Sequence, residues 1–369
     1  MESNDLIYKI AIGNISGIGN INAKKLISKV GSAEAVFKEK KSNLLKIDGF
    51  GKTLVNKILN NNALENIDKE IEFITKYNIK VLYYLDKSYP KRLKHCEDSP
   101  IVLFVKGDLD FEKCKVLSII GTRNATKYGK EICDKLIEEL TQKNHDVLIV
   151  SGLAYGIDIA AHKSALKYGL ETAGVLAHGF SQIYPSAHKS YAKKMLDQGG
   201  LVTEFLSTET PERQNFVKRN RIIAGLSDAT IVVESGKKGG ALITADIANS
   251  YNRDVFAFPG RTNDKWSEGC NKLIKTNKAA LIENVEDLEY ILGWEVNAKK
   301  KKSVQKKIFI ELSDEEKIIH NILKDIGEVT IDVIALKSNM PVSKVSPVLL
   351  NLEFSGLVKS LPGSRYIIV

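Results

Sequence analysis

Short apolar runs alternate with longer amphipathic segments through the middle of the chain, between residues 115 and 284. A continuous apolar run suits a strand that is buried on both faces, and strands of this kind separated by helices are typical of a parallel sheet. The pattern therefore predicts an α/β fold with a Rossmann-like core. The runs that we assign to strands are KVLSIIG, DVLIVSG, TAGVLAHG, GLVTEF, ATIVVES, DVFAFPG and AALIEN.

The N-terminal part of the chain has helical periods separated by two similar turns. The segments around these turns read ISGIGNINAKKLI and IDGFGKTLVNKIL, with two glycines before each helix. They resemble the helix-hairpin-helix motif of helical, SAM-like domains, in which the glycines let backbone amides at a helix N-terminus approach a DNA phosphate. The alternative is a helical pair that only supports the fold, and the sequence leaves both interpretations open.

The C-terminal part reads as three helices and a hairpin, SDEEKIIHNILKDIG, TIDVIALKSN, VSKVSPVLLNLEFSG and LVKSLPGSRYIIV. This order indicates a winged-helix domain. Its third helix is mostly apolar and carries Lys344 as its only lysine or arginine, so we favour a protein-contact or regulatory role over base reading in a DNA groove. We divide the chain into a helical domain, a Rossmann-like domain, a lysine-rich linker and a winged-helix domain, at residues 1–80, 81–295, 296–310 and 311–369.

The net charge adds a preference for a class of partner. The 369 residues include 54 Lys and Arg against 45 Asp and Glu, a formal charge of +9, which favours a polyanion such as nucleic acid. A lysine-rich proteome would produce the same excess of positive charge. Only the placement of the charges along the chain can distinguish this explanation from a polyanionic partner.

Other patterns exclude several classes of protein. No long apolar run and no N-terminal signal pattern occurs, so we expect neither a membrane span nor export. The four cysteines form no C-x-x-C pair, which argues against a zinc site or a disulfide framework and fits a reducing cytoplasm. Asp158 and His162 lie four residues apart but lack a third ligand or a second carboxylate, so we predict no metal site, no catalytic residue and no cofactor.

Ligands of Rossmann-like folds bind at the carboxyl ends of the strands. The first of these ends, Gly121-Thr122-Arg123, lacks the G-x-G-x-x-G pattern of nicotinamide and flavin sites and instead combines an arginine with helix-start amides, a pair that suits phosphate. The loop with Lys237 and Lys238, before the helix ALITADIA, has the same character. A flexible glycine turn with solvated lysines is the alternative for that loop.

The segment from residue 213 to 221 places four cations and no acid around Phe216, just before the apolar helix that we expect at IIAGL. Single-strand binders use this combination, because the cations follow the DNA backbone while a base stacks on the ring. Alternatively, Phe216 belongs to the core and the arginines pair with carboxylates such as Glu204 and Glu234.

Taken together, the motifs of these loops resemble the DprA (Smf) family in order and spacing. They are YPKRLKHCEDSPIVLFVKGD, IIGTRNATKYG, SGLAYGIDIAAHKSAL, IYPSAH, FVKRNRIIAGLSDATIVVES, GGALITADIA and FAFPGRTNDKWSEGCNKLIK, between residues 89 and 280. The resemblance implies a protein that binds single-stranded DNA without sequence preference, protects it from nucleases and loads a RecA-type recombinase in natural transformation. It also implies a homodimer formed through the Rossmann-like domains. We therefore expect a cytoplasmic DNA-binding protein that is not an enzyme.

The resemblance and the loop chemistry select overlapping residues. The complete set of predicted DNA-binding residues is Gly121, Arg123, Arg213, Phe216, Lys218, Arg219, Asn220, Arg221, Lys237 and Lys238. Of these, the resemblance itself implies a pocket that contains Arg123, Phe216, Arg219 and Arg221, flanked by Lys238. Family members typically read K-S-G-A-L-I-T where this chain has a glycine in place of the serine, so a hydroxyl that could bind phosphate is missing.

A nucleotide or nucleoside-phosphate hydrolase is the alternative function, because cytokinin-activating phosphoribohydrolases have a similar Rossmann-like fold. Their hallmark P-G-G-x-G-T-x-x-E is absent, since Arg261 and Thr262 follow Pro259 and Gly260. A dimer that mainly scaffolds other proteins is a third interpretation. For the predicted dimer, we expect the helix in EGCNKLIKTN and its neighbours to contribute to the interface.

Overall fold

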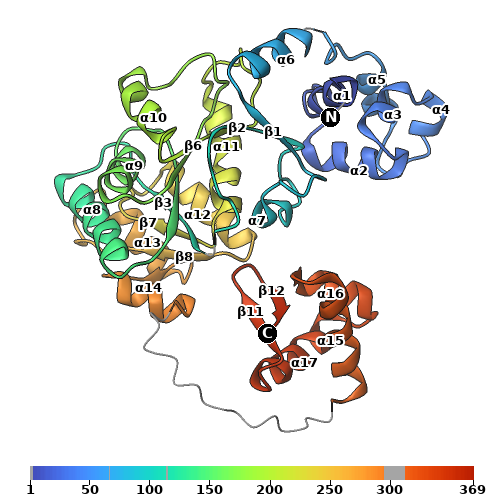
Figure 1. Ribbon diagram of the computed structural model, residues 1–369. Helices are drawn as coiled ribbons and strands as arrows, with labels where there is room; N and C mark the ends of the chain where they lie inside the picture. Colours follow the sequence, from blue (N-terminus) through green and yellow to red (C-terminus); the bar gives the residue numbers. More distant parts are fainter. Residues whose placement is uncertain (1–2, 66, 114, 295–311) are drawn as a thin grey trace.

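The computed structural model describes residues 3–65, 67–113, 115–294 and 312–369. Three units follow one another along the chain: a helical unit, a large sheet with helices on both faces, and a small unit of helices and strands (Figure 1). The predicted lysine-rich linker, residues 296–310, lies outside the described residues. No helix in the described part of the chain is long and apolar enough to cross a lipid bilayer.

The N-terminal unit is built from short helices. They are α1 (Ser3–Gly13), α2 (Asn20–Val30), α3 (Ala33–Lys38), α4 (Lys41–Leu44), α5 (Lys52–Leu59) and α6 (Ile67–Lys76). Two glycine turns lead into α2 and α5, as the repeated segments predict. Gly17 and Gly49 have φ values of +77° and +84° in these turns, a backbone conformation that glycine adopts without strain.

The two glycine turns are related by a reciprocal contact. A Cβ at Gly49 would lie 3.5 Å from Nζ of Lys25, which belongs to α2, and a Cβ at Gly17 would clash with Nζ of Lys57, which belongs to α5. The helix α2 therefore places Lys25 at the turn before α5, and α5 places Lys57 at the turn before α2. DNA binding by these turns stays a prediction.

A nine-stranded sheet forms the central unit. The strands are β1 (Lys80–Tyr83), β2 (Val102–Gly107), β3 (Lys115–Ile120), β4 (Val147–Gly152), β5 (Thr172–Val175), β6 (Gly199–Thr203), β7 (Ala229–Val232), β8 (Asp254–Ala257) and β9 (Ala280–Leu281). Their order is β1-β2-β6-β5-β4-β3-β7-β8-β9. The apolar runs assigned to strands form β3 to β9, which pair with one another in parallel, so the predicted parallel core is confirmed. The sequence pattern does not predict β1 and β2, which extend the β6 edge as antiparallel strands.

Helices cover both faces of the sheet because strand side chains alternate between the faces. The helices are α7 (Lys91–Lys94), α8 (Lys127–Gln142), α9 (Ile157–Tyr168), η1 (Ser186–His188), α10 (Lys189–Met195), α11 (Arg213–Leu226), α12 (Gly240–Ser250), α13 (Glu268–Lys275) and α14 (Val285–Leu292). Val116 and Ile120 of β3 pack in one apolar core with α11 and α12. Leu117 and Ile119 of the same strand pack in the other core with α8 and α9.

The C-terminal unit has the predicted winged-helix order. Its elements are α15 (Asp314–Ile326), β10 (Val329–Thr330), α16 (Ile331–Ser338), α17 (Val342–Phe354), β11 (Val358–Leu361) and β12 (Arg365–Ile368). Ile319, Ile334 and Leu349, one from each helix, are fully buried in a separate apolar core. The prediction of a winged helix is therefore confirmed, with β10 as an additional short strand against β12.

The turn between β11 and β12 contacts the large sheet where β7 and β8 begin. Arg253 Nη1 donates to the carbonyl of Pro362 at 3.1 Å, and Arg365 Nη2 lies 3.4 Å from Asp228 Oδ1 in a buried ion pair. Asp228 directly precedes β7 and Arg253 directly precedes β8. The winged helix therefore docks at the amino ends of these strands, at the opposite edge from their carboxyl ends.

Candidate nucleic-acid interface

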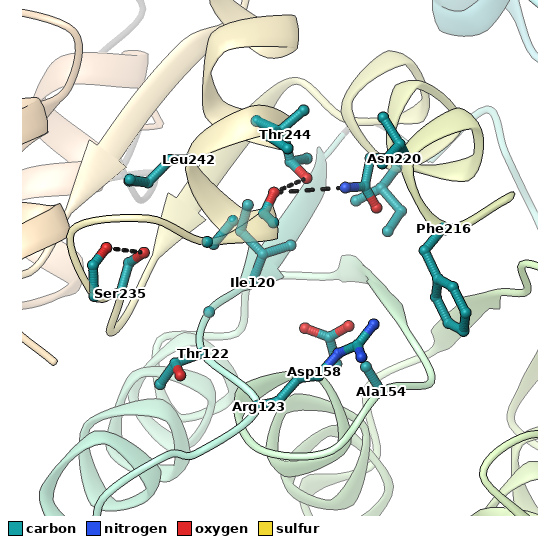
Figure 2. Close-up of a pocket in the computed structure, with 18 of the residues that line it drawn as sticks. Ile120, Thr122, Arg123, Ala154, Asp158, Phe216, Asn220, Ser235, Leu242 and Thr244 are labelled. Atoms are coloured by element: carbon teal, nitrogen blue, oxygen red, sulfur yellow. Dashed lines mark hydrogen bonds between the residues drawn. The ribbon is translucent and has the colours of Figure 1, made fainter. Parts of the chain in front are cut away.

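A pocket of about 980 Å³ lies where β3 and β7 end, bordered by the starts of α11 and α12 (Figure 2). From β3 the chain continues to β4 on one side, and from β7 it continues to β8 on the other. Helices diverge at such a switch point, which leaves room for a ligand. The predicted DNA-binding residues that line the pocket are Gly121, Arg123, Arg213, Phe216, Arg219, Asn220 and Lys238.

The basic segment forms the first part of α11, in contrast to the expectation that it precedes the helix. Because a helix turns about 100° per residue, it cannot present all of its cations on one side. Arg213, Phe216 and Asn220 recur every three to four residues and line the pocket. Lys218 is exposed and lies outside the lining, as does Lys237 of the following loop.

Arg221 also lies outside the pocket, which corrects its predicted place. It forms an ion pair with Glu204, in which the side chains are 11% and 13% exposed. It also donates to the backbone carbonyl of Asp98. The alternative interpretation, that an arginine of this segment pairs with Glu204, is therefore right for Arg221.

Phe216 presents its ring to the pocket. The ring lies 6.0 Å from the Tyr184 ring between centroids, at an interplanar angle of 65°. The guanidinium carbon of Arg123 lies 4.9 Å from the Phe216 centroid, and that of Arg219 lies 6.0 Å from it. Cations at these distances are attracted to the ring. Phe216 is half-buried and lines the pocket, so the interpretation of Phe216 as a core residue is not supported.

Arg219 is buried in the wall of the pocket, with 4% of its surface exposed. Its Nη1 donates to the carbonyl of Val175 at the end of β5, and its Nε donates to Asn220 Oδ1 at 3.2 Å. Burial, together with the like charge of Arg123, lowers the pKa of Arg219 to about 10, and Asp158 acts against this shift. With a pKa of about 10 the guanidinium stays charged at neutral pH, so Arg219 supplies a fixed positive charge.

Asp158 and Arg219 meet at Gly152. A Cβ at Gly152 would lie 2.5 Å from both Arg219 Nη1 and Asp158 Oδ2, so a side chain here would displace one of them. Burial raises the pKa of the Asp158 carboxyl, while the charges of Arg219 and Arg123 act against that shift. Figure 2 shows Asp158 next to Arg123 in the pocket wall. Asp158 therefore interacts electrostatically with both Arg123 and Arg219.

His162, which the sequence analysis paired with Asp158, does not line the pocket. Its Nε2 donates to the carbonyl of Gly152 at 2.8 Å, and its Nδ1 lies 2.6 Å from Thr172 Oγ1. Burial lowers the pKa of His162 to about 4. His162 is fully buried and is absent from the pocket lining.

Glu234 fixes the loop that carries Arg123. Its backbone carbonyl accepts a hydrogen bond from Thr122 N at 2.7 Å. Its carboxylate accepts from the backbone N of Thr126 at 2.9 Å and from the Thr126 hydroxyl at 2.5 Å. A carboxylate also suits this place because α8 begins at the next residue. Glu234 therefore positions a loop, in contrast to the alternative that it pairs with an arginine.

The start of α12 forms another side of the pocket. Gly239 is its N-cap, with extended backbone and no side-chain cap. The carbonyl of Gly240 accepts from Thr244 Oγ1 at 3.1 Å and from Asn220 Nδ2 at 3.5 Å, which ties α12 to α11 (Figure 2). Uncapped first-turn amides next to Lys238 suit a phosphate.

Tyr184 and Trp266 also line the pocket, although the sequence analysis does not single them out. Tyr184 follows β5 and Trp266 follows β8. Both lie within segments that resemble the family motifs, IYPSAH and FAFPGRTNDKWSEGCNKLIK, which is the one signal that could have indicated them. Only the strand order brings these two loops to the same pocket.

Comparisons with known proteins agree with this architecture. Residues 80–292 match the family described as DNA recombination-mediator protein A, and residues 310–364 match the DprA winged helix domain. Protein Smf of Synechocystis sp. is 30% identical to this chain, over 99% of this chain and 99% of its own length.

Solved structures show the same relationship. The X-ray structure of DNA processing protein A (DprA) from Streptococcus pneumoniae superposes with a TM-score of 0.64 and 31% identity, and the match covers 77% of this chain and 97% of that one. DNA processing protein A from Helicobacter pylori, whose structure concerns its mode of single-stranded DNA binding, gives 0.53 and 28%, over 59% and 97% of the two chains. With its central domain and winged helix both matched, the chain belongs to the DprA (Smf) family of DNA recombination mediators.

Proposed function

We propose that this chain binds single-stranded DNA without sequence preference in the pocket between α11 and α12. The observation that carries the proposal is the Phe216 ring, half-buried, with the Arg123 guanidinium 4.9 Å from its centroid. A base can stack on such a ring while the cations contact the neighbouring phosphates, and neither interaction depends on the identity of the base. The similarity to the Helicobacter pylori protein supports the choice of single-stranded DNA.

The proposed role is to protect incoming single strands from nucleases and to pass them to a RecA-type recombinase in the cytoplasm during natural transformation. On this proposal the chain acts by binding and does not catalyse a reaction. Membership of a family of DNA recombination mediators supports this role.

The proposal includes a homodimer formed through the sheet unit. Leu281 of β9 is 45% exposed, and Tyr290 and Ile291 of α14 are 87% and 43% exposed. β9 is an edge strand, and apolar side chains beside an edge favour association with another surface. Light scattering of the full chain should give the mass of a dimer, and Tyr290→Glu should shift it toward a monomer. A wild-type protein that is monomeric at all concentrations would contradict the dimer.

Fluorescence anisotropy of a labelled oligo-dT, compared with its duplex at two salt concentrations, tests DNA binding. We expect the wild type to prefer the single strand and Phe216→Ala to lose about 5- to 150-fold in affinity, the range for the loss of one base–aromatic stack. Lys218→Ala is the matched control, because it removes a cation from the same helix outside the pocket lining. It should weaken binding only slightly.

Equal affinity of the wild type and a folded Phe216→Ala variant would exclude the pocket as the DNA site. Equal or negligible binding of single strand and duplex would reject the proposed function. The alternative of a nucleotide hydrolase would then be examined with nucleoside monophosphates, and release of a free base would support it.

A further inference from the structure

Two aromatic side chains of the pocket lining come from loops that follow different strands. Tyr184, which contacts Phe216, follows β5, whereas Trp266 follows β8. Three strands separate β5 from β8 in the sheet, so these strands lie roughly 19 Å apart at about 4.8 Å per step. The Phe216 ring on α11 and the Trp266 ring in the loop after β8 are therefore two separate aromatic surfaces of one pocket.

Trp266 is held in a fixed place by its surroundings. Its carbonyl accepts from Ser235 N at 2.8 Å, and Gly269 N donates back to the carbonyl of Ser235 at 2.8 Å. The six-membered part of the indole lies against Gly236, where a Cβ would be 3.4 Å from Cε3 and Cζ3. These contacts attach the loop to the end of β7 and leave the ring half-buried in the pocket lining.

The surroundings of Trp266 combine cations with an aromatic face. Lys265 Nζ lies 4.9 Å from the ring centroid, and Lys238 lines the pocket with Trp266. The neighbouring acid, Asp264, is engaged locally, because its carboxylate accepts from Trp266 N at 3.2 Å and from the Ser267 hydroxyl at 2.9 Å. A cation beside an aromatic ring is the arrangement that binds a nucleotide unit, through its phosphate and its base.

We infer that Trp266 is a second base-stacking site, so that one DNA strand runs from Phe216 to Trp266 and a nucleobase stacks on each ring. Lys238 and Lys265 contact the phosphates next to the second base. The inference rests on the proposed binding of single-stranded DNA. It adds a subsite for a nucleobase on the side of the pocket that the loop after β8 forms.

Tryptophan fluorescence tests this subsite directly, because the chain has only two tryptophans. Trp294 is 9% exposed and packs near His145, with ring centroids 5.9 Å apart, in the core on the other face of the sheet. Trp294→Phe therefore leaves Trp266 as the single emitting tryptophan. We expect oligo-dT to quench its emission along the same binding curve that anisotropy records.

Trp266→Ala should also weaken oligo-dT binding by about 5- to 150-fold, whereas Trp266→Phe, which keeps a ring, should retain most of the affinity. Trp294→Phe is the matched control and should bind as the wild type does. If Trp294→Phe does not fold, the loss of quenching from wild type to Trp266→Phe gives the same information.

Unchanged Trp266 emission at saturating oligo-dT, or wild-type affinity of Trp266→Ala, would overturn the inference and leave the proposed function intact. No binding of oligo-dT by the wild type would instead reject the proposed function, and the subsite with it.

Discussion

The guanidinium of Arg123 lies 4.9 Å from the ring centroid of Phe216, although the two residues come from different elements of the chain. Arg123 is carried by the loop between β3 and α8, and Phe216 lies in the first turns of α11. A planar guanidinium can lie on a ring and still donate hydrogen bonds to a phosphate, which an ammonium group does less well. Arg123 therefore makes two contributions: it packs against the Phe216 ring, and it adds a positive charge to the pocket.

Arg123→Lys should separate these two contributions. We expect oligo-dT affinity to fall about 2- to 5-fold through the loss of a contact worth about 0.5–1 kcal/mol, with an unchanged salt dependence. Arg123→Ala should lower the slope of log affinity against log salt by about 0.7 as well, because one phosphate contact is lost. Anisotropy titrations at several salt concentrations measure both quantities. Equal slopes for Lys and Ala variants would show that Arg123 contacts no phosphate.

Arg219→Ala should reduce the free energy of unfolding by about 3–5 kcal/mol, because it leaves the buried Asp158 carboxyl without the adjacent cation. The carbonyl of Val175 also loses its donor. Urea unfolding followed by circular dichroism measures the change, and Lys218→Ala on the same helix is the control, expected within about 0.5 kcal/mol of the wild type. A stability of Arg219→Ala equal to that of the control would show that the arginine is not a structural part of the pocket.

His162 should make stability depend on pH. Burial lowers the pKa of His162 from 6.5 to about 4, so between these values the folded state binds fewer protons than the unfolded state. The associated stability is present above pH 6.5 and is lost as the pH falls toward 4, by about 3 kcal/mol. Unfolding of the wild type and His162→Gln at pH 7 and pH 4.5 should show a smaller pH effect in the variant. His320→Gln, in the winged helix, should retain the wild-type pH effect; identical profiles for all three proteins would contradict the assignment.

Asp228 connects the winged helix to the sheet. Its carboxylate accepts from Arg92 Nε at 2.7 Å and from Val116 N at 2.9 Å, and it pairs with Arg365 at 3.4 Å. Arg365→Ala should release the winged helix from the sheet unit and so increase the radius of gyration in small-angle X-ray scattering. The stability of the sheet unit should change little. Asp228→Ala should in addition destabilise the sheet unit by about 3–5 kcal/mol, since Arg92 loses its partner.

Lys359→Ala is the control for the winged helix, because this exposed residue of β11 has the same charge but lies away from the contact. It should scatter as the wild type does. The same scattering curve for Arg365→Ala would mean that the ion pair does not hold the winged helix in place.

The sequence by itself determined the secondary structure of the parallel core and of the winged helix. Continuous apolar runs mark strands buried on both faces, and β3 to β9 follow these runs. It did not indicate β1 and β2, which extend the sheet at its edge as antiparallel strands. The apolar run IVLFV, within which β2 begins, precedes the alternating strand and helix pattern and is not assigned to a strand for that reason.

Tertiary structure decided which side chains share the pocket. The basic segment is rich in cations, but its helical period turns Arg221 toward Glu204 while Phe216 and Asn220 line the pocket. Tyr184 and Trp266 reach the same pocket only because the strand order places the ends of β5 and β8 along one edge of the sheet. The composition of one segment determines its chemistry, whereas the neighbours of a side chain depend on the packing of segments far apart in the chain.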